Sequence, residues 1–370
     1  MIRAEEVFAK AKDRATLSRQ EAYWLWDEAP LERLAAVADE VRRGVVADSN
    51  VVTWQIDRNV NITNVCVSGC KFCNFHCKPH QTQKAFITSI EVYREKIDRM
   101  LELGGDQLLL QGGMHPRLGV EFYEDLFSEL KRLYPNVRLH ALGPPEVAHI
   151  AKVSEITSRQ CLERLVAAGL DSLPGAGAEI LDPQVRKSIS PAKPSVEEWL
   201  EVMHEAHEMN LATSATMMYG HIETPHQRVD HLLRIRDLQD RCPEGNYGFL
   251  AFIPWIFRST GTRLEAEGVK SNFSSLEYIR VIAVSRLILN NIRNIQASWL
   301  TVGKATAQLA LHSGANDMGS IMIEENVVAS AGAHNKCDAE GIQRAIREAG
   351  FTPQLRDQLY RPRVYEVGAK

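Results

Sequence analysis

The sequence predicts an α/β protein folded as a (β/α)₈ TIM-type barrel, with a helical segment before the barrel and a tail after it. Short apolar segments alternate with amphipathic helix patterns along most of the chain, which is typical of parallel βαβ units. Strand-like segments occur eight times, and eight such units match the size of a closed barrel. An open, doubly wound sheet remains the alternative fold, because periodicity alone does not show closure.

The elements follow one another in a regular order. Residues 1–48 form the predicted helical segment, in which Ser18 and Glu21 have capping-box spacing. The barrel is expected over 49–335, and a C-terminal helix and tail packed on it over 336–370. The predicted strands are residues 51–62, 106–111, 136–142, 170–175, 211–220, 247–255, 294–300 and 320–325. The clearest helix patterns lie at 119–135, 195–210, 224–241 and 273–291.

The composition is that of an ordinary globular protein, with 45% hydrophobic residues and a formal net charge of −4. This charge gives no electrostatic reason to expect nucleic acid or an anionic membrane as a partner. No apolar run approaches the roughly 20 residues that span a bilayer, and the N-terminus lacks the apolar core of a secretory signal. We therefore expect a cytoplasmic location, where clustered cysteines are metal ligands or redox groups more often than disulfides.

Four of the seven cysteines, Cys66, Cys70, Cys73 and Cys77, follow the first predicted strand. At that place a barrel builds its active site, on the loops after the strands. Three thiolates can hold three corners of a [4Fe–4S] cube and leave one iron open, whereas four would close a zinc or electron-transfer site. A zinc site could also use His76 or His80 in place of one cysteine. The spacing by itself leaves zinc and iron–sulfur open.

The segment Cys66-x₃-Cys70-x-Phe72-Cys73 resembles the signature of radical S-adenosylmethionine (SAM) enzymes. This resemblance implies that Cys66, Cys70 and Cys73 bind one [4Fe–4S] cluster whose fourth iron is chelated by SAM. It also implies that Phe72 packs near the adenine and that Cys77 is not a ligand. The cofactors would supply the reactive radical, while the barrel positions them and excludes water.

Two further segments are candidates for contact with SAM. In radical SAM enzymes a glycine-rich strand end binds the SAM amino group, and the matching positions are Gln111, Gly112 and Gly113. A tight turn that needs permissive dihedral angles is the alternative role of the glycines. Glu179 follows three small residues, and a contact with the SAM ribose or amino group is expected. Its alternative role is a carboxylate favoured by a helix N-terminus.

Longer motifs, including "SLPGAGAEIL", "TSATMMYGHIETPHQ", "QASWLTVGK" and "EENVVASAG", resemble the cyclic dehypoxanthine futalosine synthases of the futalosine route to menaquinone. In that family a 5′-deoxyadenosyl radical takes hydrogen from the ribose C4′ of a small-molecule substrate, and the carbon radical then closes onto a benzoate ring. An electron donor such as a flavodoxin or ferredoxin is implied. Aminofutalosine synthase and the tyrosine-dependent enzymes of deazaflavin synthesis are the alternatives. A non-catalytic zinc or iron–sulfur protein is the alternative of another class.

That chemistry makes three demands on the protein. The benzoate carboxylate needs a cation or amide donors, for which Arg58 is the candidate, with a structural salt bridge as its alternative role. The final proton needs a base, and His221 and Glu223 after strand 211–220 are the candidates. A buried structural histidine is the alternative role of His221. The candidates for contacts with ribose hydroxyls are Tyr219, Ser298 and Asn326.

Overall fold

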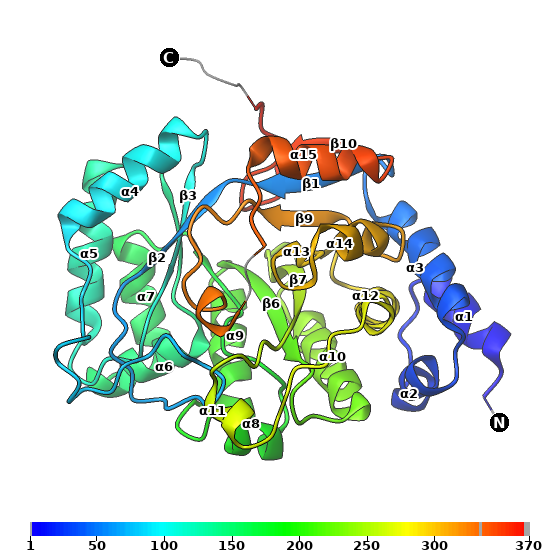
Figure 1. The fold of residues 1–370 in the computed structure, drawn as a ribbon, viewed down its shortest axis with the longest axis horizontal. Coiled ribbons are helices and arrows are strands. Elements are labelled where there is room, and N and C mark those ends of the chain that lie inside the picture. The colour runs from blue at the N-terminus through cyan, green and yellow to red at the C-terminus, as the bar shows by residue number, and fades with distance from the viewer. Residues whose placement is uncertain (1, 333–334, 366–370) are drawn as a thin grey trace.

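The computed structural model describes residues 2–332 and 335–365, and its centre is a ring of parallel strands surrounded by helices (Figure 1). Seven strands pair in chain order to form one sheet. They are β2 (Asp57–Asn61), β3 (Gln107–Gln111), β4 (Arg138–Ala141), β5 (Ser172–Leu173), β6 (Ala212–Tyr219), β7 (Phe249–Ile256) and β8 (Asn294–Ile295). Every pairing in this sheet is parallel.

The remaining strands close the ring. β1 (Val51–Gln55) runs almost directly into β2 and pairs with β9 (Asp317–Ser320). A single bridge between Gln296 and Asp317 links the end of β8 to β9. Because β1 and β2 are successive parts of one stretch of chain, these pairings join both ends of the larger sheet. The predicted barrel and its N-terminal helices are confirmed.

Two features of the ring differ from the prediction. The last barrel strand was expected at 320–325 but ends at Ser320, and Met322 follows with a positive φ of 51°. A further strand, β10 (Thr352–Leu355), pairs in parallel with the outer edge of β1. It is four residues long and contains Pro353, so it lacks the apolar pattern that identifies a central strand.

Helices cover the outside of the ring. The longer ones between strands are α4 (Ile90–Glu102), α5 (Val120–Leu133), α6 (Pro144–Val153), α7 (Ser158–Ala168), α8 (Pro183–Ile189), α9 (Val196–Glu208), α10 (Pro225–Asp240), α12 (Ser275–Ile288) and α14 (Lys304–Leu311). In α5 the buried residues Val120, Tyr123, Phe127 and Leu130 recur every three or four positions, so one face packs on the barrel. Burying each such side chain stabilises the fold by about 1.5–3 kcal/mol.

The helices before the barrel are α1 (Ala4–Lys12), α2 (Arg19–Asp27) and α3 (Leu31–Val45), and they lie beside α10 and α12 at one edge of the molecule (Figure 1). At the start of α2, the Ser18 hydroxyl accepts a hydrogen bond from Glu21 N, and the Glu21 carboxylate accepts one from Ser18 N. This is the predicted capping box.

Short helices and the C-terminal elements complete the structure. They are α11 (Arg263–Ala266), α13 (Trp299–Val302), the 3₁₀ turn η1 (Ala329–Ala331) and α15 (Ala339–Glu348), which precedes β10. Among the described residues, no helix has both the length and the apolar character that crossing a membrane requires.

Candidate active site

The cysteine loop follows β2 and is tied back on itself close to its start. Cys66 N donates to the Cys77 carbonyl oxygen at 3.0 Å, and Cys77 N donates to the Asn64 carbonyl oxygen at 2.8 Å. The Cys77 thiol is buried and lies 3.5 Å from Asn64 Oδ1. Cys77 therefore helps to close the loop at its base.

The other three cysteines of the loop line a large cavity of about 380 Å³ inside the barrel. The Ser68 hydroxyl lies 2.9 Å from the Cys66 sulfur and 3.3 Å from the Cys70 sulfur. Burial raises the pKa of the Cys70 thiol to about 11, although Lys193 and Ser68 oppose this shift. Iron binding would displace these protons, because the thiolate is the ligating form. Three thiols at one cavity wall fit a cluster held by three cysteines.

The predicted glycine-rich strand end packs directly against this loop. Gln111, Gly112 and Gly113 all line the cavity. A Cβ atom at Gly113 would lie 2.2 Å from the Val65 carbonyl oxygen, a separation that no side chain tolerates. Neither glycine has a positive φ. The residues are therefore small because β3 and the cysteine loop approach closely, and turn geometry is not the reason.

A buried lysine connects three residues on the same side of the cavity. Lys193 Nζ pairs with Glu179 Oε1 at 2.6 Å and lies 5.3 Å from the centre of the Phe72 ring. Burial alone would lower the pKa of Lys193, but the Cys70 thiol and Glu179 hold this pKa above its ordinary value. Glu179 has a φ of +47°, a strained conformation of the kind that clusters at functional sites.

Polar side chains of β1 and β2 face inward along the whole cavity. Gln55, Asp57, Asn59 and Asn61 alternate with side chains that point outward, as the period of a β-strand requires. Burial raises the pKa of Asp57 to about 6, against the hydrogen bond that Asp57 accepts from the Ser320 hydroxyl. Five side chains of the cavity lining carry a buried atom without a hydrogen-bond partner in the described residues: Gln55 Nε2, Asn59 Oδ1 and Asn61 Nδ2 of β1 and β2, Gln107 Oε1 of β3, and Tyr360 Oη after β10.

Comparison with known proteins identifies the family. Residues 60–235 match the model of the radical SAM superfamily, and residues 246–367 match the CofH/MqnC C-terminal region. The chain is 42% identical to the cyclic dehypoxanthine futalosine synthase of Streptomyces coelicolor, over 96% of this chain and 88% of that one. The chain belongs to the radical SAM enzymes.

Other similarities are broader. The chain is 37% identical to the 5-amino-6-(D-ribitylamino)uracil–L-tyrosine 4-hydroxyphenyl transferase 1 of Methanosarcina mazei, over 97% of this chain and 94% of the relative. The crystal structure of methylornithine synthase covers 95% of this chain, and the chain covers 98% of it, with a TM-score of 0.69 and 18% identity. At that identity the likeness concerns the fold alone.

In this radical SAM enzyme, the two residues predicted as the base do not line the cavity. His221 and Glu223 are paired at 3.0 Å with fully buried side chains, and Arg228 Nε lies 2.7 Å from Glu223 Oε1. Burial would raise the pKa of Glu223, but the hydrogen bonds and charges of His221 and Arg228 lower it to about 2. This cluster has the geometry of a structural ion-pair network.

The predicted substrate residues are divided between two places. Ser298 lines the cavity and donates a hydrogen bond to the Pro254 carbonyl oxygen at 2.7 Å. Tyr219, Arg58 and Asn326 do not line it. The Tyr219 ring packs under the Arg228 guanidinium at 4.8 Å.

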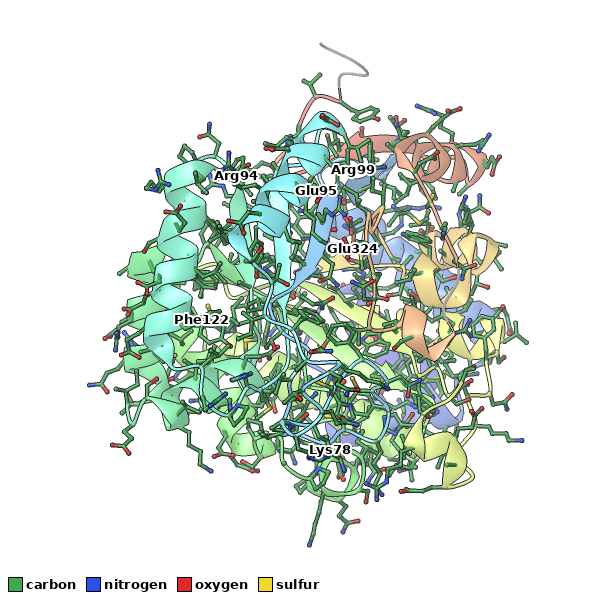
Figure 2. The ribbon with its side chains drawn as sticks, turned by 60° about the vertical axis from the view of Figure 1, so that its left-hand side comes forward. Lys78, Arg94, Glu95, Arg99, Phe122 and Glu324 are labelled. Atoms are coloured by element: carbon green, nitrogen blue, oxygen red, sulfur yellow. The ribbon has the colours of Figure 1, made fainter. Side chains whose placement is uncertain are left out.

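Arg58 lies behind β2, on the outer side of the barrel wall, and Asn326 lies at the carboxyl end of β2, beside Asn61. Arg58 points outward because it alternates with Asp57 and Asn59, and its Nη2 lies 2.8 Å from Glu324 Oε2. Lys96 of α4 pairs with the same carboxylate. Figure 2 shows Glu324 in the loop after β9, next to β2 and α4. The Asn326 amide donates to Asn61 Oδ1 at 3.0 Å.

Several residues that line the cavity were not predicted from the sequence. Lys193 and Glu146 sit in segments rich in proline, where nothing in the pattern distinguishes them from surface charges. Burial raises the pKa of Glu146 to about 7. The inward residues of β1 and β2 did leave a signal, since "QIDRNVN" places polar residues at every second position.

Proposed function

We propose that this chain converts dehypoxanthine futalosine into its cyclic form, the product for which the Streptomyces coelicolor relative is named. The observation that carries the proposal is a single cavity with three cysteine thiols at one end and a polar inner wall below them. The substrate combines a ribose with an aromatic carboxylate. Buried amide and hydroxyl groups that have no partner among the described residues suit a ligand that is rich in oxygen atoms.

The residues around the cysteines suit the two cofactors of the family. Cys66, Cys70 and Cys73 would hold a [4Fe–4S] cluster, and SAM would lie against the lining residues Phe72, Gln111, Gly112, Gly113 and Glu179. When bound, these groups supply a primary carbon radical that removes hydrogen from ribose C4′. The electron that starts this chemistry would come from a partner such as a flavodoxin or ferredoxin.

The chain itself must keep water away from the radical. Three loops meet over the carboxyl ends of the strands, where Asn74 Nδ2 donates to the carbonyl oxygens of Thr260 and Ser330 at 2.9 and 3.0 Å. Lys71 pairs with Glu267 at 2.8 Å at the same rim. These contacts tie the cysteine loop to the loops after β7 and β9, and such closure protects reactive intermediates.

Ring closure releases one electron, which would return to the cluster that Cys66, Cys70 and Cys73 hold, and one proton, for which the cavity needs an acceptor. Two carboxyl groups line the cavity with a raised pKa, Asp57 and Glu146. We assign the acceptor role to Asp57, because it lies on the inner wall below the cysteines. His221 and Glu223 remain candidates only if the substrate reaches outside this cavity.

An anaerobic assay tests the proposal. Reconstituted protein, SAM, a strong reductant and dehypoxanthine futalosine are mixed and analysed by mass spectrometry. The expected result is 5′-deoxyadenosine together with a product two hydrogen atoms lighter than the substrate. Formation of 5′-deoxyadenosine without that product would contradict the substrate and retain the reaction class.

The second candidate is the tyrosine transferase reaction named for the Methanosarcina relatives, which are 36–38% identical to this chain. Incubation with L-tyrosine and 5-amino-6-(D-ribitylamino)uracil under the same conditions separates the two. We expect no adduct of these compounds. An adduct, with dehypoxanthine futalosine unchanged, would favour the transferase.

A further inference from the structure

The cavity has a second end, opposite the cysteines, which the strands by themselves do not close. The lining follows β3 from its first residue, Gln107, to its last, Gln111, so it spans the full height of the strand. The cysteine loop closes the end near Gln111. At the other end, the chain after β10 turns under the barrel, and Arg356, Gln358 and Tyr360 become part of the lining. We call this end the floor.

A buried ion pair fixes the orientation of one amide at the floor. Arg356 binds both carboxylate oxygens of Asp317, at 2.6 and 3.0 Å, and its Nη1 donates to Gln55 Oε1 at 2.8 Å. Because the side-chain oxygen of Gln55 accepts this bond, the side-chain nitrogen is the atom that remains to donate a hydrogen bond to another group. That nitrogen is buried and has no partner within residues 2–332 and 335–365.

A tyrosine adds a second donor at the same place. The Arg356 guanidinium lies 3.9 Å from the centre of the Tyr360 ring. Tyr360 has a φ of +60°, which is uncommon for a large side chain and indicates that its surroundings hold it there. Its hydroxyl is buried and is also without a partner in the described part of the chain. The floor therefore holds an N–H donor and an O–H donor beside the Arg356–Asp317 ion pair.

We propose that Gln55 and Tyr360 form a subsite for the aromatic carboxylate of the substrate, with Arg356 as a positioning residue. This inference rests on the proposed function. Ribose C4′ must lie at the cysteine end, where the radical arises, so the acid end of the molecule points to the floor. Between the two ends, Leu109 and Ile253 offer apolar surface for the ring. Donor hydrogen bonds to a carboxylate are stronger than those between neutral groups.

Binding without turnover tests the subsite. Reconstituted protein with SAM but no reductant is titrated by calorimetry with dehypoxanthine futalosine and with its carboxamide. We expect Tyr360→Phe to raise the Kd of the acid by about tenfold and that of the amide by less than about threefold, since a bond to an ionised group is the stronger one. Equal losses for both ligands, or no loss for the acid, would overturn the subsite.

A matched control is available on α4. The Tyr93 hydroxyl is also buried without a partner in the described residues, but Tyr93 does not line the cavity. Tyr93→Phe removes the same atom and should leave both Kd values unchanged. Iron content and SAM binding of Tyr360→Phe should match the wild type, which excludes general damage to the fold.

The outcomes also separate the subsite from the proposed function. If Tyr360→Phe shows the selective loss for the acid but the wild type forms no cyclic product after a reductant is added, the proposed function fails and the subsite stands. If the wild type does not bind the acid, the subsite is overturned.

Discussion

Two sets of buried polar side chains in this barrel differ in how completely they are paired. Behind the end of β6, the Glu223 carboxylate accepts hydrogen bonds from Gly220 N and His221 N and pairs with Arg228. Inside the cavity, Gln55 and Tyr360 are among the residues with buried atoms that lack partners in the described chain. An unpaired buried group lowers stability by about 1–3 kcal/mol. Several such groups around one cavity therefore indicate a ligand, whereas charged groups that pair with one another indicate a structural role.

The comparison also shows that the position of a residue along a strand does not by itself decide whether the residue contacts the substrate. His221, Glu223 and Ser298 all follow the carboxyl ends of strands, where barrel enzymes place their catalytic groups. Only Ser298 lines the cavity, because the Glu223 side chain turns toward Arg228 and the His221 side chain turns toward Glu223. The direction of the side chain separates a candidate for substrate contact from a residue that holds the loop.

The largest expected effect concerns the cysteines. Alanine at Cys66, Cys70 or Cys73 should abolish cluster assembly and all SAM cleavage, because each thiol lines the cavity end that fits the cluster. Iron content and 5′-deoxyadenosine formation measure this. Cys77→Ala is the matched control, since its thiol faces Asn64, and it should retain a normal cluster. Loss of iron in Cys77→Ala would favour a closed, four-cysteine site.

The next effect tests the inner wall. Asp57→Asn should lower the rate of cyclisation by about 100- to 1,000-fold, as expected for loss of a proton acceptor, while 5′-deoxyadenosine still forms. The wild-type rate should fall as pH drops below about 6, because Asp57 then becomes protonated, and the variant should lack this dependence. A variant with the normal rate and pH profile would exclude Asp57 as the acceptor.

The sequence was informative wherever a repeating pattern reports on the backbone. Strand–helix alternation predicted the barrel, and spacing predicted the Ser18 capping box. Tyr360 reaches the cavity only because the segment after β10 returns beneath the barrel. No local sequence pattern predicts that path. Lys193 likewise becomes a cavity residue only through its long-range pairing with Glu179 and its place over Phe72.

A smaller effect is expected for the cluster of His221, Glu223 and Arg228, and it concerns the stability of the fold. At pH 7, Glu223→Gln should lower the free energy of unfolding by roughly 3 kcal/mol, because the native pKa of Glu223 is about 2 against an ordinary 4.5. The folded state gains this stability above pH 4.5 and loses it as pH falls toward 2. Urea titrations at several pH values measure the difference. A folded variant that cyclises the substrate at the normal rate would support the structural role. A large loss of rate in the fully folded variant would make Glu223 a candidate base again.

The smallest effect is expected at Arg58, the residue that the sequence assigned to the substrate carboxylate. Its guanidinium pairs with Glu324 behind β2 and does not line the cavity, whereas Gln55 and Tyr360 do. Arg58→Met should therefore change the KM for dehypoxanthine futalosine by less than about twofold, within the range of a group that does not touch the substrate. Lys96 still pairs with Glu324 in this variant, so the loss of stability should stay at about 1 kcal/mol. A tenfold rise in KM would move the carboxylate site from the floor to the outer wall.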